Sequence, residues 1–511
     1  MTQRQPNILF IQTDQLTPNV LPAYGNTTCK TPNLNHLAHT GIVFDNAYCN
    51  FPLCAPSRFS MASGLLASKI GAYDNAAEFP ASIPTYAHYL RVLGYHTTLA
   101  GKMHFVGPDQ LHGFEKRLTS DIYPGDFGWT ADWGATDSNG APGGRMLTDS
   151  RMLDMSGICA RSVQIDYDEE ITHKAVQEIY DHVRSSDNRP FFLQVSYTHP
   201  HDPYLCQKRH WDLYDGLEIP APRIASIKEQ DNDPHSLRTL RQQGLNTAKT
   251  SAHDIMRSRR AYYGNVSYID DQVGLLLDAI SQSGQAEDTV IVFSSDHGDM
   301  LGERGLWLKK MFFEPAVRVP LIIQAPSRFE PARIATLCSL LDLLPTFVDL
   351  AAIDEWQGPV EPLDGISLIA LTRSKTADDN RAVYAELLCE GIPSPKFMIR
   401  KGPHKFITGA GDPDLLFDLE RDPDELNNVI YHQEYSDIAK QFSSEASTIW
   451  DVDALSKDIV NSQKRRMLIQ RAHAEGQPPI WDFNAEGEGS SRWFRGDGNY
   501  NDWAFDYLPE P

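Results

Sequence analysis

The sequence has no long hydrophobic run and comparatively few basic residues. No apolar stretch approaches the roughly 18 residues that a transmembrane helix needs. The first one, residues 8–11, is shorter than the apolar region of a signal peptide, which has about 7–15 residues. We therefore expect a cytoplasmic protein that does not act at a membrane. Lys and Arg number 46 against 68 Asp and Glu, a formal net charge of −22, and they form no run. Nucleic acid is therefore not expected as a partner either, since it selects clustered positive charge.

Cysteine is also sparse and lacks a pairing pattern. The seven cysteines are scattered, and none forms a CxxC pair. This argues against a disulfide framework and against a structural zinc site. What remains, at 41% hydrophobic and 22% charged residues, is the composition of an ordinary globular protein, which excludes disorder, collagen and coiled coil as the dominant state.

Short buried strands alternate with helices over most of the chain. The apolar patterns predict strands at residues 7–11, 95–100, 191–196, 289–295 and 321–324, and helices at residues 83–93, 170–183 and 269–280. This alternation predicts an α/β fold with a mixed, mostly parallel sheet sandwiched by helices. In such sheets ligands bind at the carboxyl ends of the strands.

Changes in sequence pattern and composition divide the chain into three regions. We assign residues 1–380 to the α/β domain. Residues 381–475 hold short strands and then a long helical region at 433–475, which predicts a smaller α+β subdomain. Residues 476–511 form a tail with eight aromatic residues and seven acids against two arginines. Such a tail either docks on the body or on a neighbouring subunit, which favours a homo-oligomer, or helps to enclose a cation.

Polar side chains directly follow several of the predicted strands. Asp14 follows the first strand, Asp296 and His297 follow the strand at 289–295, and the segment 199–201 follows a third. Two carboxylates and an imidazole are ligands for a divalent cation, and a set rich in oxygen favours Ca²⁺, with Mg²⁺ or Mn²⁺ as alternatives. An Asp at a strand end can equally be a helix cap or a turn former, so position alone leaves both interpretations open.

Cys54 stands at a predicted helix start. Pro56 and Ser57 favour helix initiation, and Arg58 lies one turn in. A thiol near the positive end of a helix dipole is either a reactive group beside an anion site or a small buried hydrophobe. The residues alone favour neither.

Two longer motifs decide between these interpretations. Residues 54–58 read CAPSR, and residues 94–104 read GYHTTLAGKMH. Both resemble the signatures of the type I sulfatases, whose cysteine is oxidised to formylglycine. The positions of Asp14, Asp296 and His297 resemble the metal site of the alkaline phosphatase superfamily. The resemblance spans roughly residues 7–430 and implies an alkaline-phosphatase-like fold and sulfatase activity.

Five further segments resemble the choline sulfatases. They read YDNAAE at 73–78, GPDQLHGFE at 107–115, DIYPGDFGW at 121–129, THPHDPY at 198–204 and DHGDMLGERG at 296–305. In that branch, and in the related phosphonate monoester hydrolases, a histidine takes a metal position that is an amide in most sulfatases, and His297 matches it. This resemblance implies hydrolysis of choline-O-sulfate, a small sulfate ester with a quaternary ammonium, to choline and sulfate.

The same resemblance implies a cofactor set. A maturation enzyme would convert Cys54 to formylglycine, whose hydrate attacks sulfur while it is bound to the divalent metal. The implied metal ligands are Asp14, Cys54, Asp296 and His297. The implied catalytic residues are Cys54, Arg58, Lys102, His104, His201 and Lys309.

Each catalytic residue has an implied role. Arg58 and Lys102 would stabilise negative charge on residue 54 and on the sulfuryl oxygens. His201 or Lys309 would protonate the leaving alcohol, and His104 would act as a base when sulfate is released. Taken without the family, these side chains could be surface or turn residues.

The organic end of the substrate implies a second set. A quaternary ammonium prefers aromatic faces and nearby carboxylates. The resemblance places Asn75, Trp129 and Glu386 in the pocket, and Asp502 in the tail is a possible addition. Trp129 alone would fit core or interface packing just as well.

Three other functions stay open at this stage. The same scaffold could hydrolyse phosphonate monoesters or phosphodiesters, or another small alkyl sulfate. A protein that only binds quaternary ammonium compounds is the non-enzymatic alternative. The retention of Cys54 with the complete polar set disfavours that alternative.

Overall fold

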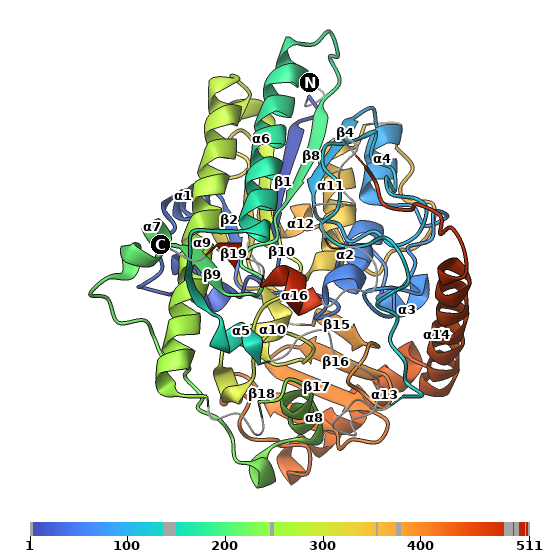
Figure 1. Cartoon of the computed structure of the whole chain (residues 1–511). Coiled ribbons are helices and arrows are strands. Elements are labelled where there is room, and N and C mark those ends of the chain that lie inside the picture. The colour runs from blue at the N-terminus through green and yellow to red at the C-terminus, as the bar shows by residue number, and fades with distance from the viewer. Residues whose placement is uncertain are drawn as a thin grey trace.

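The computed structural model describes residues 4–135, 150–245, 250–353, 356–374, 380–484, 494, 500–505 and 507–508. Within this part of the chain the main sheet has eight strands (Figure 1). In spatial order they are β13 (Ala332–Ile334), β2 (Ile42–Phe44), β12 (Leu321–Gln324), β10 (Thr289–Ser295), β1 (Asn7–Thr13), β8 (Phe191–Ser196), β4 (His96–Gly101) and β5 (Lys116–Arg117). The four central neighbours, β10, β1, β8 and β4, run parallel.

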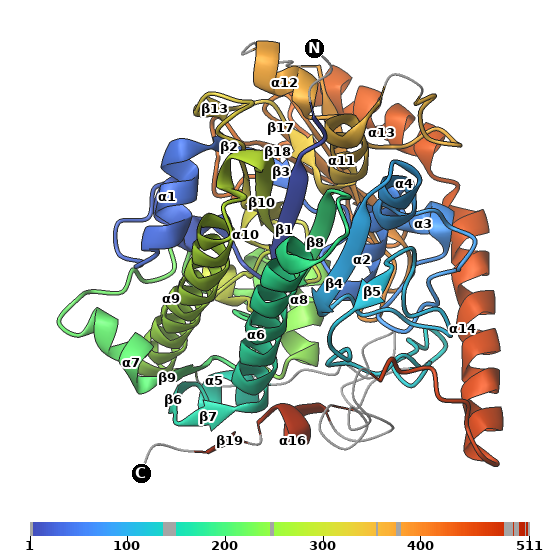
Figure 2. The same ribbon diagram turned by 90° about the horizontal axis from the view of Figure 1, so that it is seen from above.

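Helices cover both faces of this sheet, as Figure 2 shows from above. One face carries α1 (Pro32–Thr40), α6 (Val163–Arg184) and α9 (Ala252–Gln282), and the other carries α2 (Cys54–Ser63), α4 (Tyr86–Val92) and α11 (Leu343–Ala351). Every residue of β1 is buried, with Ile8 and Phe10 in one core and Leu9 and Ile11 in the other. A strand buried on both faces reads as a continuous apolar run, which is why the sequence predicted it correctly.

The predicted α/β class, with its mixed, mostly parallel sheet between helices, is confirmed. The strands predicted at 191–196, 289–295 and 321–324 coincide with β8, β10 and β12. One feature that the apolar pattern does not reveal is direction: β12 runs antiparallel both to β10 and to β2.

The C-terminal region forms a second, antiparallel sheet. Its order is β15 (Ala382–Leu387), β16 (Lys396–Lys401), β17 (His404–Gly409) and β18 (Leu415–Asp418), and it is followed by α13 (Ser436–Ile449) and α14 (Val452–Ala474). The helical region expected at 433–475 is therefore interrupted. Trp450 stacks on Phe397 at a centroid distance of 4.3 Å, and Asp451 caps α14 by accepting from the amide of Ala454. These two contacts end one helix and begin the next.

Smaller elements complete the fold. Two further strand groups are β11 (Arg318–Val319), β3 (Ala47–Tyr48) and β14 (Cys338–Ser339), and β6 (Gly157–Cys159) with β9 (Leu205–Gln207). The short helices are α3 (Ala67–Ile70), α5 (Arg151–Asp154), α7 (Lys208–Trp211), α8 (Pro234–Gln242), α10 (Glu314–Val317) and α12 (Ile369–Ser374). None of the helices described here has the length and apolarity of a membrane span.

Part of the tail returns to the first domain. Its described pieces are residues 476–484, where Trp481 packs against Phe127, then Phe494, the short helix α16 (Tyr500–Ala504), Phe505 and β19 (Tyr507–Leu508), which pairs with β7 (Arg161–Ser162). The hydroxyls of Tyr500 and Tyr123 lie 3.1 Å apart. The rest of the tail lies outside the described residues. This docking places Tyr500 beside the carboxyl ends of the central strands, where the polar residues gather.

Candidate active site

Four potential metal ligands converge at the carboxyl ends of β1 and β10. Asp14 follows β1, Asp296 and His297 follow β10, and Cys54 is the first residue of α2. Each offers one ligand atom, these atoms lie within 4.8 Å of one another, and all four residues are buried. The structure thus brings together the whole set of ligands that the sequence suggested.

Two buried cations brace the carboxylates from behind. Arg58 donates from Nε to Asp296 Oδ2 (2.8 Å) and from Nη2 to Asp14 Oδ2 (2.9 Å), and Lys102 Nζ reaches Asp14 Oδ2 at 2.6 Å. Burial would raise the pKa of Asp14, but nearby positive charges, that of Lys102 first and also that of Arg58, outweigh it and hold that pKa well below its usual value. Because both cations contact Oδ2, the Oδ1 atom of Asp14 stays available to the cluster.

The orientation of His297 suits a metal ligand. Its Nδ1 lies 3.0 Å from the carbonyl oxygen of Gly298, which can only accept, so Nδ1 carries the proton and Nε2 presents a lone pair. Nε2 lies 3.3 Å from Cys54 Sγ. Burial lowers the pKa of His297, but the charges of Asp296 and Cys54 outweigh it and raise it. The same negative field favours a cation, so the donor set fits a divalent metal ion.

Cys54 sits at the buried N-terminus of α2. Its side chain is 1% exposed, and Sγ lies 3.7 Å from Asp14 Oδ1. The backbone around it is held from two sides. The amide of Ala55 donates to Asn75 Oδ1 (3.0 Å), and Ser57 Oγ donates to the carbonyl of Asp296 (2.6 Å). Residue 54 is therefore fixed against the ligand cluster before any substrate binds.

Lys309 and His201 form a second buried pair beside the ligand cluster, with His201 Nε2 3.9 Å from Asp14 Oδ1. Lys309 Nζ lies 2.6 Å from His201 Nε2 and also donates to Gln15 Oε1. Burial lowers the pKa of His201, and the charge of Lys309 lowers it further. Burial also acts against the charge on Lys309, but the charges of Cys54, Asp202 and Asp14 raise its pKa. At neutral pH the shared proton therefore resides on the lysine.

His104 lies just beyond the end of β4. Gly101 and His104 both have left-handed backbone, with φ of 103° and 59°, which turns the chain sharply after the strand. The ring is buried, neither of its nitrogens has a hydrogen-bond partner within the described structure, and it packs against Tyr123 and Trp129. Burial and the charge of Lys102 lower its pKa to about 3. His104 is therefore a neutral base at neutral pH.

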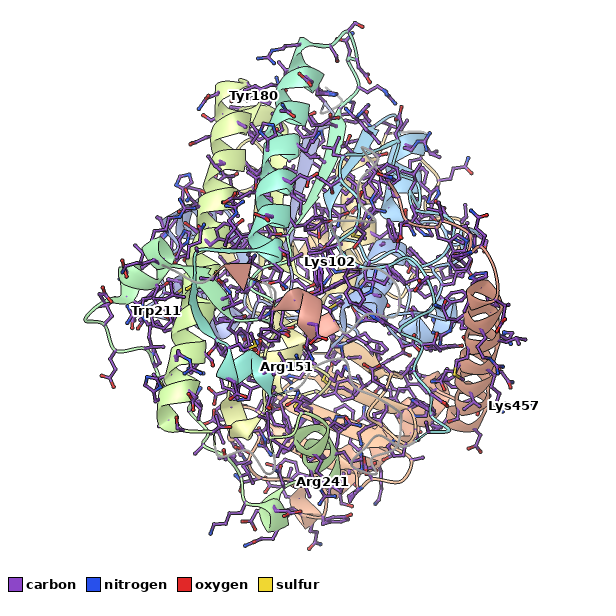
Figure 3. The ribbon with its side chains drawn as sticks, viewed as in Figure 1. Lys102, Arg151, Tyr180, Trp211, Arg241 and Lys457 are labelled. Carbon is purple, nitrogen blue, oxygen red and sulfur yellow. The ribbon has the colours of Figure 1, made fainter. Side chains whose placement is uncertain are left out.

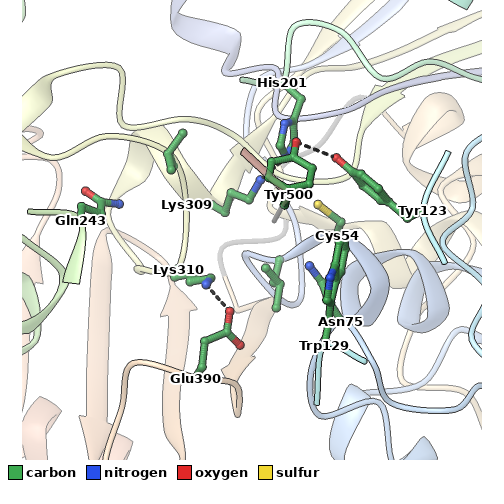
Figure 4. A pocket seen from close by; sticks show the side chains of 12 residues that line it. Cys54, Asn75, Tyr123, Trp129, His201, Gln243, Lys309, Lys310, Glu390 and Tyr500 are labelled. Carbon is green, nitrogen blue, oxygen red and sulfur yellow. Dashed lines mark hydrogen bonds and ion pairs between the residues drawn. The ribbon is translucent and has the colours of Figure 1, made fainter. Parts of the chain in front are cut away.

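A cavity opens directly over Cys54 (Figure 4). The empty space between its lining atoms, counted together with the open solvent at its mouth, is about 490 Å³. Its lining combines the pair Lys309 and His201 with aromatic rings and one carboxylate. The lining residues are Leu53, Cys54, Asn75, Tyr123, Trp129, His201, Gln243, Leu308, Lys309, Lys310, Glu390 and Tyr500. Lys102, labelled in Figure 3, is fully buried and is not a lining residue, but its Nζ lies 4.2 Å from the ring centre of Tyr123.

Two residues expected in the substrate pocket are not among its lining residues. Glu386 is fully buried, and its carboxylate accepts from the amide and hydroxyl of Ser68 and from Trp450 Nε1 (2.6 Å). Its hydrogen bonds tie the C-terminal sheet to α3. The side chain of Asp502 is 71% exposed and pairs with Arg151 at 3.0 Å. The structure thus uses Glu386 in packing and Asp502 in a surface ion pair.

Other residues take the places expected for these two. Glu390, four positions after Glu386, lines the cavity and pairs with Lys310. Tyr500 brings the tail to the cavity in place of Asp502. Tyr123, within the segment 121–129, completes the aromatic wall. An acid near residue 386 and an aromatic tail were visible in the sequence, but nothing in it distinguished Glu390 from Glu386.

Comparison with known proteins adds an independent line of evidence. The profile of the Sulfatase family matches residues 6–353, and that of the N-sulphoglucosamine sulphohydrolase C-terminal region matches residues 302–450. The chain is 41% identical over 505 residues to the choline-sulfatase of Rhizobium meliloti (strain 1021), covering 97% of this chain and 96% of that protein. It is 28% identical over 453 residues to an arylsulfatase of Clostridium perfringens (strain 13 / Type A), covering 85% and 92%.

Solved structures agree on the fold. The phosphonate monoester hydrolase of Agrobacterium radiobacter matches with a TM-score of 0.68 at 22% identity, over 87% of this chain and 95% of that one. The corresponding hydrolase of Silicibacter pomeroyi gives a TM-score of 0.69 at 21% identity, with the same coverage. The alkaline-phosphatase-like fold implied by the sequence motifs is confirmed. The family match over most of the chain and the near-full-length similarity lead to one conclusion: the chain belongs to the sulfatase family and is an enzyme that hydrolyses sulfate esters.

Proposed function

We propose that the enzyme hydrolyses choline-O-sulfate to choline and sulfate. The observation that carries this proposal is the cavity, which joins the ligand cluster around Cys54 to a wall of Tyr123, Trp129 and Tyr500. Aromatic faces bind a quaternary ammonium through cation–π attraction. The similarity to a choline-sulfatase supports the same substrate.

The cofactors follow from the donor set. The oxygen-rich donor set favours Ca²⁺, and a divalent cation there would acidify a bound hydroxyl. A maturation enzyme would convert Cys54 to formylglycine. The hydrate of formylglycine would offer one hydroxyl to attack sulfur and a second to expel sulfate. Asp14, Asp296, His297 and residue 54 would hold the cation.

The cations around Cys54 receive the sulfuryl group. Arg58 and Lys102 are fully buried and have fixed partners, so they do not reorganise when negative charge develops on residue 54. Lys309, unlike Arg58 and Lys102, lines the cavity and would contact the ester directly. A fixed positive wall of this kind stabilises the transition state more than the free ester.

Proton transfer to the leaving alcohol falls to Lys309. Choline is a poor leaving group, so its departing oxygen needs a proton. The raised pKa of Lys309 and the lowered pKa of His201 keep that proton on Lys309 at neutral pH. His201 Nε2 accepts a hydrogen bond from Lys309 Nζ and so orients the side chain of the lysine. His201 is itself oriented, because its Nδ1 lies 2.6 Å from the carbonyl of Asp202. His104, buried and neutral, is the base for the release of sulfate.

The ammonium end lies against the outer part of the cavity. Trp129 and Asn75 form its wall, and Glu390 supplies the carboxylate, while Lys310 limits how much of that negative charge reaches the substrate. Tyr500 covers the site from the tail. The homo-oligomer predicted from the aromatic tail stays a prediction that light scattering tests, since the described tail residues pack on their own chain.

The decisive assay compares ester classes. Purified, matured enzyme is given choline-O-sulfate, a neutral alkyl sulfate, a phosphonate monoester and a phosphodiester, and kcat/KM is measured for each. The proposal predicts the highest value for choline-O-sulfate. A higher value for either phosphorus ester would instead assign the chain to the phosphonate and phosphodiester hydrolases, and a higher value for another alkyl sulfate would change the substrate alone. Binding of choline without turnover of any ester would favour a binding protein.

A further inference from the structure

One buried ion pair joins α14 to the catalytic domain. Arg466 donates from Nη1 to Asp74 Oδ1 (2.6 Å) and from Nη2 to Asp74 Oδ2 (2.8 Å), and the two side chains are 5% and 0% exposed. Otherwise α14 buries little, since its other buried residues are Ile459 and Gln463. The helix lies at the outer edge of the molecule (Figure 1), where Lys457 extends away from the body (Figure 3). A bidentate pair in this place fixes both position and angle.

The ion pair lies behind one wall of the cavity. Asp74 directly precedes Asn75, which lines the cavity, and Asp74 Oδ1 also accepts from the amide of Ala76 (2.9 Å). Asn75 in turn holds the amide of Ala55, beside the nucleophilic position. Arg466 therefore determines where the chain segment that carries Asn75 lies.

The same guanidinium reaches a second wall. Arg466 Nη1 lies 3.3 Å from Thr130 Oγ1, which itself donates to the carbonyl of Phe127 (2.8 Å) and closes the turn that carries Trp129. One turn earlier on α14, Gln463 Oε1 accepts from the amide of Trp133 (3.0 Å). Arg466 and Gln463, one turn apart on α14, thus hold the two ends of the segment 129–133.

The indole of Trp133 extends the anchor to a third wall. Its Nε1 donates to the carbonyl of Cys389 (2.9 Å), the residue before Glu390. The segments that carry Asn75 and Trp129 therefore meet at residues 463–466 of α14, and the segment that carries Glu390 is joined to them through Trp133. None of these contacts involves the metal ligands or Lys309.

We propose that Arg466 is a positioning residue that sets the preference for a cationic substrate. It touches no reacting atom, and it acts by holding Trp129 and Asn75 where they fit a quaternary ammonium. Cation–π attraction requires the charge within about 6 Å of the ring centre, so a small displacement of Trp129 weakens it. The inference rests on the proposed function, because it requires Trp129 to contact the ammonium.

The test compares two adjacent arginines on one helix. Arg466→Lys keeps the charge but loses the bidentate fork, and Arg465→Lys, at an exposed position, is the matched control. Steady-state kinetics are measured with choline-O-sulfate and with its uncharged carbon isostere, 3,3-dimethylbutyl sulfate. For Arg466→Lys we expect KM to rise by up to about tenfold for the cationic ester, the size of one lost cation–π contact. We expect a clearly smaller rise in KM for the isostere and little change in kcat with either ester. The KM ratio, defined as KM for the isostere divided by KM for choline-O-sulfate, should not change in the control Arg465→Lys.

Further variants keep the inference refutable if Arg466→Lys fails to fold. Thr130→Val removes only the hydroxyl that contacts Arg466 and closes the turn, so it should shift the KM ratio in the same direction by a smaller factor. A purely structural role for Arg466 would lower the melting temperature or kcat with both esters alike, and that result overturns the inference. Trp129→Ala distinguishes the positioning role of Arg466 from the ammonium site on which it depends. If it shifts the KM ratio and neither Arg466→Lys nor Thr130→Val does, only this inference fails. If Trp129→Ala does not shift the ratio, the proposed ammonium site fails as well.

Discussion

Replacing Lys309 by methionine tests the assignment of the general acid. Methionine keeps much of the side-chain volume but has no proton to donate. His201 does not take over at neutral pH, because burial, the larger cause of its lowered pKa, persists in the variant, and so does the charge of Lys102. The departing alkoxide of choline would then leave without a proton.

The expected loss follows from what proton donation contributes. General acid catalysis is worth about 10²- to 10⁴-fold, which is about 3–5 kcal/mol of activation free energy. We therefore expect kcat for choline-O-sulfate to fall by at least about 100-fold. An activated aryl sulfate releases a phenolate that needs little protonation, so its kcat should fall less than about tenfold.

The assay measures sulfate release from both esters by wild type, Lys309→Met and Lys310→Met. Lys310 is the matched control, because the change removes the same charge from the next residue of the same cavity, where the lysine pairs with Glu390. In Lys310→Met the fold loss in kcat should be the same for both esters, although KM for the cationic ester alone would respond to the unpaired charge of Glu390. Equal fold losses with both esters in Lys309→Met would refute the assignment of Lys309 as the acid.

Three further predictions address the nucleophile, the metal and the stability of the fold. Cys54→Ala should abolish multiple turnover, and sulfate release at the wild-type rate would remove residue 54 from the mechanism. Chelation should abolish activity and lower the melting temperature, because the carboxylates of Asp14 and Asp296 would lose their cation, and added Ca²⁺ should restore both. Glu178 is mostly buried, yet the nearby His96, whose Nε2 lies 3.4 Å from Oε1, and hydrogen bonds from Lys116 and Thr98 outweigh the effect of burial and lower its pKa from 4.5 to about 2. The stabilisation by the Glu178 carboxylate is therefore present above about pH 4.5 and is lost as the pH falls towards 2. Glu178→Gln should lower the free energy of unfolding at pH 7 by at most about 3 kcal/mol, and this difference from wild type should shrink on acidification. Glu475→Gln, at an exposed position, should leave the free energy of unfolding unchanged.

The elements that local patterns describe well were predictable. β8, β10 and β12 have the bounds that their apolar runs suggested, because strands buried on both faces carry a continuous signal. The direction of β12 was not predictable, since an apolar run carries no orientation. The break between α13 and α14 depends on Trp450 packing against Phe397, a contact between residues more than fifty positions apart.

In the candidate site, too, features set by local sequence patterns were predictable and those set by contacts between distant residues were not. The proximity of the four candidate metal ligands was predictable because each follows a strand end or lies in a motif, and parallel strands bring those ends together. The choice between Glu386 and Glu390 depends on Trp450 and Ser68, which capture the first carboxylate from distant parts of the chain. The anchoring of the cavity by Arg466 likewise depends on a partner 392 positions away.

The central claim is that residue 54 becomes a formylglycine that hydrolyses choline-O-sulfate. The most direct test is the mass of the peptide spanning residues 51–58, from protein co-expressed with a formylglycine-generating enzyme, paired with sulfate release from choline-O-sulfate by the same sample. The account predicts a mass about 18 Da below that of the thiol peptide, with turnover in proportion to the converted fraction. Full turnover by protein that carries only the thiol, or a converted peptide without sulfate release, would contradict it.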